Sequence, residues 1–493
     1  MNVTPERALY SVAQVRAIDR HAIDELGVPG YTLMQRAAQG AFEQLVECWP
    51  QAHALALLCG PGNNGGDAFL LGALARQRGF EVTALALGES APGDATRARE
   101  AFLDAGGSLL AAEQAADIPH ADVLIDGLFG TGLNRAPDGA AADLIKRANA
   151  CGVPILALDV PSGLDADSGT ARAPSVRAAA TATFVAHKRG LFTADAADHT
   201  GTLRLQRLEL PHPPAAIGPP DAELLAAHGL PPRVRNSHKG ANGHVLALGG
   251  EEGMGGAIRL CGEAALRCGA GLVSVATRRA HVESLHAARP ELLVHALEDQ
   301  ADLTPLLRRA SVLALGPGLG QGDWGRAIWQ AAMAWHGPRV VDADALNLLA
   351  RHALALGPEC VITPHPGEAA RLLETDVPSV QADRFAAVRA LAARCGAVAV
   401  LKGSGSLVAA PDGRVAVCPW GNPGMASGGM GDVLTGVIAA LMAQGLSAWE
   451  AACLGTGLHA RAGDRAAAAG GERGLLASDL FLPLRELLNA VDE

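Results

Sequence analysis

The sequence predicts an α/β protein of two domains, each built on a largely parallel sheet. In two successive blocks, short and nearly continuous apolar runs alternate with helix-like segments, as in parallel sheets that helices cover on both faces. Between the blocks, segment 210–220 (LPHPPAAIGPP) has five prolines in eleven residues and cannot continue as a helix or a central strand. A chain of 493 residues holds two or three domains at roughly 100–200 residues each. We therefore expect domains over 1–215 and 225–493.

The first block begins with an amphipathic helix, which the spacing of apolar residues predicts over residues 11–26. Five apolar runs follow, and we interpret them as strands: 53–60, 81–88, 122–127, 153–160 and 181–187. Helix-like segments lie between most of these runs, which favours a parallel sheet over an antiparallel one.

The second block repeats this pattern with six apolar runs. The predicted strands are 244–250, 272–277, 311–318, 339–345, 360–365 and 397–403. After them, residues 406–418 predict a β-hairpin that turns at Asp412-Gly413, a dipeptide typical of tight hairpin turns.

Composition and charge argue against several classes of protein. The net charge is −11 and basic residues form no run, which disfavours nucleic acid as a partner. No apolar stretch reaches the roughly 20 residues that span a bilayer, and the first 27 residues lack the pattern of a signal peptide. Nine dispersed cysteines without a CxxC pair are typical of reduced thiols. We expect a cytoplasmic protein without nucleic-acid or membrane partners.

Lysine is rare in this chain, because only four of the 40 basic residues are lysines. Codon bias explains the excess of arginine, but the two side chains are not interchangeable where a point charge is needed. Lys188, Lys239 and Lys402 each precede glycine or a basic-glycine turn, whereas Lys146 lies in a helix-like surface segment without a motif. Lys188, Lys239 and Lys402 are therefore candidate functional residues.

Polar residues follow three predicted strands of the first block. Residues 60–67, GPGNNGGD, formally contain GxGxxG, which is a weak dinucleotide fingerprint that a tight structural turn explains equally well. Asn64, Asp126 and Ser162 each come after a different strand, and ligands of such sheets bind at the carboxyl ends of strands. Converging oxygen atoms suit a hard cation, and a monovalent ion is a plausible occupant, although each residue alone could cap a helix or a turn.

The motifs PGNNGGD, DGLFGTGL and DVPSGLD, in this order, resemble the NAD(P)H-hydrate epimerase family over about residues 10–210. The resemblance implies a Rossmann-like three-layer αβα domain that interconverts the R and S forms of hydrated NADH and NADPH (NADHX and NADPHX). It also implies a potassium ion held by Asn64, Asp126 and Ser162. Positions that match the substrate-binding residues of the family are Asn63, Asn64, Gly65, Gly66, Asp67, Gly130, Thr131, Gly132, Leu133, Asn134, Arg135, Ala136 and Asp159. Ala68 stands where the family usually has glycine and could crowd the turn.

Asp159 is the candidate catalytic group of this domain. The hydrate is a carbinolamine whose C6 hydroxyl lies beside the ring nitrogen, so loss and return of that hydroxyl through an iminium-like species inverts the centre. A carboxylate that donates and takes back a proton serves both steps.

The second block has no GxxxxGK[ST], HExxH or GxSxG, but residues 421–436 hold six glycines around Asp432. Glycines before a helix leave backbone N–H groups free to bind an anion, and the helix dipole adds positive potential. An aspartate at that helix start could take a proton from a hydroxyl that attacks phosphate, whereas the alternative is a capped helix after a glycine-rich turn.

This segment resembles the GGTGD signature of ribokinase-like folds, and further motifs narrow the resemblance to the ADP-dependent (S)-NAD(P)H-hydrate dehydratase family over residues 225–490. Those motifs are NSHKG (236–240), GMGGA (253–257), GPGLG (316–320), DADALN (342–347), TPHPGE (363–368) and LKG (401–403). The resemblance implies a ribokinase-like α/β domain in which ADP phosphorylates the C6 hydroxyl and phosphate then leaves, with magnesium bridging the phosphates. The epimerase family is the N-terminal partner of this one in bacterial bifunctional enzymes.

By the same match, the hydrate would face Ala257, Gly318, His365 and Asp432, with Asp432 as the base. The adenine nucleotide would face Lys402, Gly403, Ser404, Gly405, Ser406 and Gly431. Asp344 and Asn347 are expected to support the geometry of the site or a metal. Met430 replaces the usual threonine of GGTGD, and Ser406 and Ser427 replace threonine in flanking motifs. A backbone anion site tolerates Met430 but loses any hydroxyl contact from that position.

We therefore expect a bifunctional repair enzyme that binds NADHX or NADPHX and ADP and forms a homo-oligomer. Two alternatives stay open. One is a ribokinase-like small-molecule kinase whose product keeps its phosphate, and the other makes the N-terminal domain a non-catalytic binding module.

Overall fold

The computed structural model of the chain describes residues 4–115, 117–133, 135–352 and 354–490. By its internal contacts the chain divides into two compact units, with the division between Glu223 and Leu224. The proline-rich segment 210–220 lies just before that point and contains one short 3-10 turn, Ala215–Ile217. Each unit has its own sheet and its own buried core, as described below.

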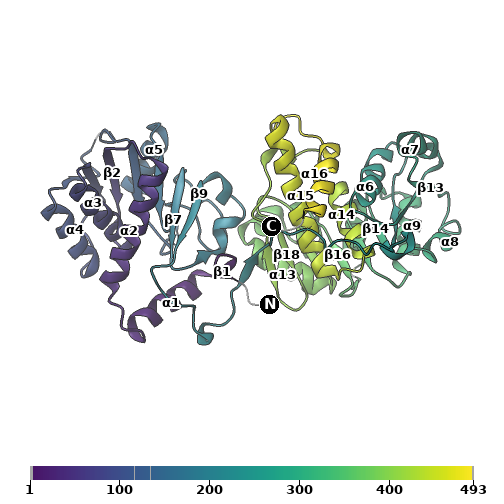
Figure 1. The fold of residues 1–493 in the computed structure, drawn as a ribbon, viewed down its shortest axis with the longest axis horizontal. Helices are drawn as coiled ribbons and strands as arrows, with labels where there is room; N and C mark the ends of the chain where they lie inside the picture. The colour runs from purple at the N-terminus through teal and green to yellow at the C-terminus, as the bar shows by residue number, and fades with distance from the viewer. Residues whose placement is uncertain (1–3, 116, 134, 353, 491–493) are drawn as a thin grey trace. The chain divides into compact units, whose positions relative to one another are not determined.

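The first unit is built on a sheet in the order β4-β3-β2-β5-β6-β7-β9, in which every neighbouring pair is parallel (Figure 1). Its strands are β2 (Ala54–Cys59), β3 (Glu81–Ala86), β4 (Ser108–Ala111), β5 (Val123–Gly127), β6 (Ile155–Leu158), β7 (Ala180–Phe184) and β9 (Thr202–Gln206). In addition, β1 (Ala8–Tyr10) pairs with β8 (His187–Lys188) in parallel and with β10 (Ala222–Leu224) in antiparallel fashion.

Helices cover both faces of this sheet because the strand side chains alternate between two cores. Leu55 and Leu57 pack in one cluster with α2, α3 and α4, whereas Ala56 and Leu58 pack in another with α5. The helices are α1 (Val12–Asp24), α2 (Gly30–Cys48), α3 (Asn63–Gln77), α4 (Asp94–Asp104) and α5 (Gly139–Ala150). The predicted three-layer αβα fold is confirmed.

The predicted first helix forms, because Ser11 caps it. The Ser11 hydroxyl accepts from the backbone N–H of Gln14, and the Gln14 side chain accepts from the backbone N–H of Ser11. The helix then turns Val15, Ile18 and Ala22 toward the core.

The second unit contains strands in the order β13-β12-β11-β14-β15-β16-β17-β18-β19, parallel from β13 to β17 and antiparallel beyond (Figure 1). They are β11 (His244–Leu248), β12 (Leu272–Thr277), β13 (Leu293–Ala296), β14 (Val312–Leu315), β15 (Arg339–Val341), β16 (Cys360–Ile362), β17 (Val398–Leu401), β18 (Leu407–Ala409) and β19 (Val415–Val417). The predicted hairpin is confirmed: β18 and β19 pair, and Gly413 of its turn has a φ of 95°.

One face of this sheet packs against α6, α14, α15 and α16 in a single apolar cluster. The alternate strand residues, such as Leu246 and Leu248, are equally buried, and α13 packs against β17 and β18. The helices of this unit are α6 (Gly255–Arg267), α7 (Val282–Ala288), α8 (Thr304–Leu307), α9 (Asp323–Met333), α10 (Ala343–Ala350), α11 (Pro366–Leu373), α12 (Val377–Ala382), α13 (Arg384–Cys395), α14 (Met430–Ala443), α15 (Ala448–Gly470) and α16 (Phe481–Asn489). The predicted α/β class is therefore confirmed here too.

The short strands β1, β8 and β10 were not predicted, and neither were β4, β9 and β13, which lie at sheet edges. An edge strand is covered on fewer sides, so it needs no continuous apolar run, and β4 is largely exposed. The predicted strand 339–345 was too long, because β15 ends at Val341 and α10 begins at Ala343.

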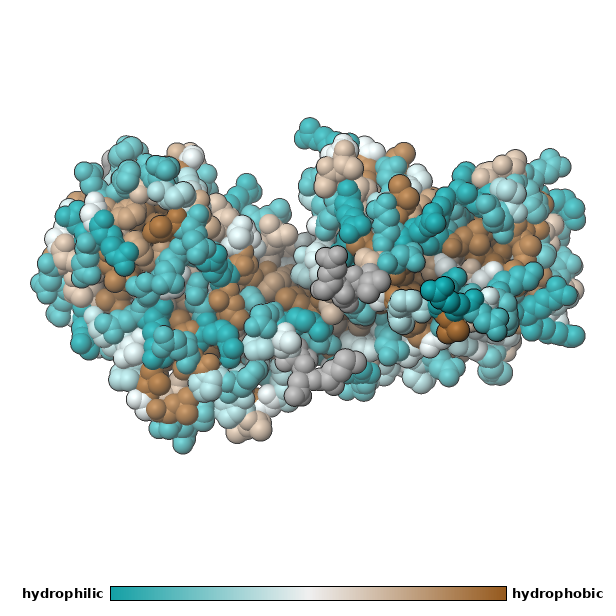
Figure 2. Space-filling view, in the orientation of Figure 1, coloured by the Kyte–Doolittle hydropathy of each residue, from teal (hydrophilic) through white to brown (hydrophobic). Residues whose placement is uncertain are grey.

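The surface is mostly hydrophilic on the face that Figure 2 shows, with smaller apolar patches between. In the described part of the chain no helix is both long enough and apolar enough to cross a membrane. All nine cysteines are free thiols.

Candidate active sites

In the first unit the predicted residues gather beyond the carboxyl ends of β2, β5 and β6. The turn after β2 is tight: a Cβ atom at residue 60 would lie 1.9 Å from the carbonyl oxygen of Leu128, and one at residue 65 would lie 1.9 Å from that of Gly60. Only glycine permits this approach. It lets α3 start at Asn63, which is exposed, and buries Asn64 to Asp67 in the first turn of the helix.

Asp126 and Ser162 are in direct contact at the ends of β5 and β6. One carboxylate oxygen of Asp126 accepts from the Ser162 hydroxyl at 2.7 Å, and the other accepts from the Ser162 backbone N–H at 2.8 Å. Burial raises the pKa of Asp126 to about 6, although these hydrogen bonds oppose the shift. Asn64 is buried as well, and neither its carboxamide oxygen nor its nitrogen has a partner. A buried amide without partners is costly unless a ligand satisfies it.

Asp159 follows β6 and adopts a left-handed φ of 63°. Its Oδ1 accepts from the ammonium of Lys188, and its Oδ2 lies 3.1 Å from where a Cβ of residue 130 would be. Two further carboxyl groups interact with this pair, those of Asp67 and Asp19. Burial and the Asp159 charge raise the pKa of Asp67 well above its usual range, and burial raises that of Asp19.

The loop after β5 carries the remaining predicted substrate residues. The Gly130 carbonyl accepts from the Leu133 N–H at 3.3 Å, and Arg16 of α1 donates to the Thr131 carbonyl at 3.0 Å. Gly132, Arg135 and Ala136 are exposed. Asn134 lies outside the described residues.

In the second unit Asp432 occupies the first turn of α14, after Gly429 with a φ of 92°. Burial and the nearby charge of Asp342 raise the pKa of Asp432 to about 7, and Lys402 opposes the shift. A carboxyl group with such a pKa can accept a proton near neutral pH.

Lys402 directly follows β17, and its ammonium lies beside the start of α14. Its ammonium donates to Asp342 Oδ1 at 2.8 Å and lies 3.9 Å from Glu368. Thr435 of α14 donates to the other oxygen of Asp342 at 2.9 Å, and a Cβ at residue 431 would lie 3.2 Å from the Lys402 ammonium. The structure thus brings Lys402, Gly431 and Asp432 together around the buried Asp342.

The turn after Lys402 holds the other predicted nucleotide residues. Gly403 and Gly405 have positive φ values of 136° and 59°. The Ser406 hydroxyl donates to the Gly403 carbonyl at 2.9 Å and accepts from its N–H at 3.2 Å, with Ser404 between them. This exposed turn directly follows Lys402 in the sequence. The hydrogen bonds between Gly403 and Ser406 hold its shape.

Ala257 and Gly318 lie against each other, since a Cβ at residue 318 would be 3.3 Å from that of Ala257. His365 is exposed, caps α11 and lies 3.4 Å from Glu368. Partial burial and the charge of Lys402 lower the pKa of His365. Asp344 accepts from the N–H of Gly320 at 2.9 Å, which supports the turn after β14.

Comparison with known proteins supports both halves of this description. The sequence model described as NAD(P)H-hydrate dehydratase matches residues 245–484, and the one described as YjeF-related protein N-terminus matches residues 30–190. The bifunctional NAD(P)H-hydrate repair enzyme Nnr of Coxiella burnetii is 44% identical over 98% of this chain and 99% of its own length. The chain belongs to the family of bifunctional NAD(P)H-hydrate repair enzymes.

Other members of the repair-enzyme family are as similar over their whole length. The Nnr enzyme of Escherichia coli is 45% identical over 99% of this chain and 95% of its own. Among solved structures, the ADP/ATP-dependent NAD(P)H-hydrate dehydratase of Bacillus subtilis, co-crystallized with ATP/Mg2+, is 29% identical and covers 52% of this chain and 93% of its own, with a TM-score of 0.46. The predicted family membership is confirmed by the sequence relatives.

The packing accommodates two residues that depart from the family pattern, Met430 and Ala68. The Met430 side chain is buried in the apolar cluster under α14, so it does not point into the glycine-rich turn. The Ala68 methyl lies against Gly127, where a second Cβ would be 2.6 Å away, so glycine at 127 makes room for it. The Ser427 hydroxyl donates to the Leu475 carbonyl at 3.1 Å.

Two charged residues near the repair-enzyme sites, Asp19 and Asp342, were not predicted, and Lys188 was predicted as a candidate without a specific role. Asp19 lies three residues after Arg16 on α1, so both face the same direction, which helical spacing could have suggested. Lys188 stood out only through the rarity of lysine. Asp342 lies inside the motif DADALN (342–347), but nothing in the sequence pattern marked this residue as part of a binding site.

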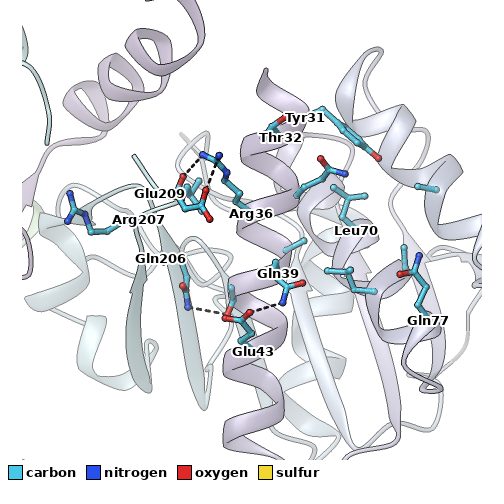
Figure 3. Close-up of a pocket in the computed structure, with 17 residues that line it drawn as sticks. Tyr31, Thr32, Arg36, Gln39, Glu43, Leu70, Gln77, Gln206, Arg207 and Glu209 are labelled. Atoms are coloured by element: carbon cyan, nitrogen blue, oxygen red, sulfur yellow. Dashed lines mark hydrogen bonds and ion pairs between the residues drawn. The ribbon is translucent and has the colours of Figure 1, made fainter. Parts of the chain in front are cut away.

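The first unit also has a cavity of about 720 Å³ away from these residues. Figure 3 shows it between α2, α3 and the segment after β9, with Arg36, Gln39 and Glu43 among its lining. No predicted site residue lines it. Some of its polar groups pair with one another, as in the Arg36–Glu209 ion pair at 2.9 Å and the Gln39–Glu43 hydrogen bond at 2.7 Å.

Proposed function

We propose that the first unit, over the expected range 1–215, epimerises the R and S forms of NADHX and NADPHX. The second unit, over the expected range 225–493, dehydrates the S form at the expense of ADP, giving AMP and phosphate. The observation that carries the proposal is a separate carboxyl group in each unit, Asp159 and Asp432, at the end of a parallel sheet where ligands of such folds bind. Membership of a bifunctional family over 98% of the chain supports assigning one step to each unit.

In the epimerisation, Asp159 handles the proton. It protonates the departing C6 hydroxyl, and the ring nitrogen lone pair supports the cation that remains. Water then adds to C6 from the other face and returns a proton to the same carboxylate, so atoms and charge balance. The free Oδ2 of Asp159 faces the loop that begins at Gly130, which places it toward the expected substrate residues.

Potassium fits the group of Asn64, Asp126 and Ser162. The unpartnered carboxamide of Asn64 supplies an oxygen. The buried carboxylate of Asp126 supplies negative charge, and a cation would offset the cost of burying that charge. A bound cation would contribute positive charge near the expected phosphate-bearing substrate. The chain's part is to hold these oxygens in place through the Ser162–Asp126 hydrogen bonds.

In the dehydration, Asp432 takes the proton of the C6 hydroxyl as that oxygen attacks the β-phosphorus of ADP and AMP leaves. The C6–O bond then breaks with release of phosphate, and loss of a C5 proton restores the ring double bond. Backbone N–H groups at the start of α14 and the Lys402 ammonium stabilise negative charge on the phosphates. Magnesium bound with ADP would neutralise part of that charge.

The remaining expectations belong to the same proposal. The partners are the small molecules NADHX, NADPHX and ADP, the chain acts in the cytoplasm, and it assembles with copies of itself. Light scattering of the purified protein tests the last of these.

The experiment is to incubate the full chain with mixed R and S hydrate and ADP, in potassium and in sodium buffer, and to follow the reduced-nicotinamide absorbance. We expect all of the hydrate to return to NAD(P)H faster than it epimerises spontaneously, and faster in potassium. D159N should convert only the S fraction at the enzymatic rate, and D432N should convert neither. A stable phosphorylated product would contradict the proposal in favour of a kinase.

A further inference from the structure

Lys188 is a buried lysine whose ammonium group is fully occupied within the protein. Its side chain is 1% exposed, and its Nζ donates to Asp159 Oδ1, to the Thr183 hydroxyl at 3.0 Å and to the Phe184 carbonyl at 2.6 Å. A lysine ammonium has three hydrogens and no lone pair. All three are used here, so none is left for a substrate.

We propose that Lys188 is a positioning residue of the epimerase reaction, which holds the Asp159 carboxylate so that Oδ2 alone faces the substrate. This inference rests on the proposed function of the first unit. Lys188 itself touches neither the hydrate nor the reacting atoms.

The two oxygens of Asp159 have different surroundings. Oδ1 accepts from Lys188 and, at 3.4 Å, from the backbone N–H of Phe184. Oδ2 accepts no hydrogen bond from the residues that the structure describes, and it lies toward Gly130, near the carboxamide of Asn64. Because a carboxylate turns as one unit, fixing Oδ1 also fixes the direction of Oδ2.

The backbone of Asp159 is held as firmly as its side chain. Its N–H donates to the Ala182 carbonyl of β7 at 2.7 Å, and its φ of 63° is one that residues other than glycine rarely adopt. Lys188 reaches the same strand through Thr183 and Phe184. Both the acid and the group that orients it are therefore hydrogen-bonded to β7.

Lys188 also supplies positive charge among the acidic groups around Asp159. Two other carboxyl groups, Asp19 and Asp67, interact with Asp159, and Lys188 is the cation that interacts with all three. The neighbouring His187 is buried, which lowers its pKa to about 4, so it stays neutral and supplies no charge at pH 7. Without Lys188 the Asp159 carboxylate would keep Asp19 and Asp67 as neighbours and lose the ammonium that offsets their charge.

The test compares K188M, T183V and K146M in the full chain. T183V removes one of the three ammonium acceptors, and K146M removes a lysine whose side chain is 65% exposed. Epimerisation is measured with the R form at saturating ADP. Dehydration of the S form, which the second unit performs, serves as the control in the same sample.

We expect K188M to lower kcat for epimerisation about 100-fold with KM within about twofold, because a misplaced acid costs rate rather than binding. The alkaline limb of its rate–pH profile should move to higher pH, because Asp159 acts first as the proton donor and the carboxyl groups of Asp19 and Asp67 remain beside it without the ammonium. T183V should lower kcat about two- to tenfold. K146M should match the unchanged chain, and dehydration of the S form should be unaffected in all three.

The outcomes separate the inference from the proposed function. If the unchanged chain does not epimerise, the proposed function fails. If it does, and K188M keeps its kcat and pH profile, the inference is overturned. If K188M does not fold, as loss of its near-ultraviolet circular dichroism would show, T183V decides: an unchanged kcat and pH profile in T183V overturns the inference.

Discussion

Asp432 titrates in the range where a general base controls a reaction at neutral pH. Burial and Asp342 raise its pKa to about 7, and the ionised form is the one that accepts a proton. We therefore predict that kcat/KM for dehydration of the S hydrate, at saturating ADP, falls tenfold per pH unit below about pH 7 and is level above it. D432N should lower the rate about 10²–10⁴-fold at every pH. A profile that stays level down to pH 5 would exclude Asp432 as the base.

Asp342 makes contacts at the second site that its sequence motif does not reveal. It is 2% exposed, accepts from both Lys402 and Thr435, and raises the pKa of Asp432. These partners lie 60 and 93 positions away in the chain. Residue type and local spacing predicted Lys402 and Asp432 as site residues, but the acid that joins them is apparent only once the strands are assembled.

At the scale of single elements, the turn between β2 and α3 depends on the absence of side chains at particular positions. A Cβ at residue 65 would lie 1.9 Å from the carbonyl oxygen of Gly60, whereas one at residue 62 would have nothing within 4 Å. We predict that Gly65→Ala lowers the stability of the first unit by at least about 2 kcal/mol. Gly62→Ala, with an ordinary φ of −88°, should change it by less than about 1 kcal/mol.

Urea denaturation of both variants measures this difference, and the dehydratase activity of the second unit reports whether the damage stays local. Gly65→Ala should lose epimerisation and keep dehydration of the S form. Equal stability of the two variants would show that backbone movement relieves the contact at residue 65.

Strands were predictable where they are buried on both faces. The runs at 53–60 and 81–88 contain β2 and β3 because central parallel strands need apolar side chains in every position. The edge strands β4, β9 and β13 were not predicted, since β9 alternates apolar with polar residues and β4 and β13 have only four residues each. The boundary at Asp342 was missed because the chain passes from β15 to α10 with only that residue between them.

At the scale of the whole chain, each unit joins a carboxylate to a buried or half-buried lysine: Asp159 to Lys188, and Asp342 to Lys402. Three of these four residues lay near a predicted motif, because motifs mark where strands end. Their pairing could not be predicted, because it depends on which strands are neighbours. Sequence patterns thus indicated the place of each site, and the topology decided which charges meet there.

The division between the units bears on how the first can be isolated. A fragment that ends at residue 215, the expected end of the domain, lacks β10, which pairs with β1 through Ala222 and Glu223. Strand β1 in turn pairs with β8, so that Tyr10 lies opposite Lys188. The fragment also lacks Asp221, whose carboxylate lies 2.7 Å from Arg189, the residue after Lys188.

We predict that a fragment of residues 1–224 retains epimerisation at the rate of the full chain, whereas residues 1–215 melt about 5 °C lower and epimerise more slowly. The reason is that the shorter fragment leaves β1 and Arg189 without the strand and the carboxylate that hold β8, and β8 carries the lysine that orients Asp159. Thermal unfolding by circular dichroism and R-hydrate turnover coupled to added S-specific dehydratase measure both effects. Asp221→Asn in the full chain should reproduce part of the loss in rate. If both fragments melt and turn over alike, β10 does not support the site.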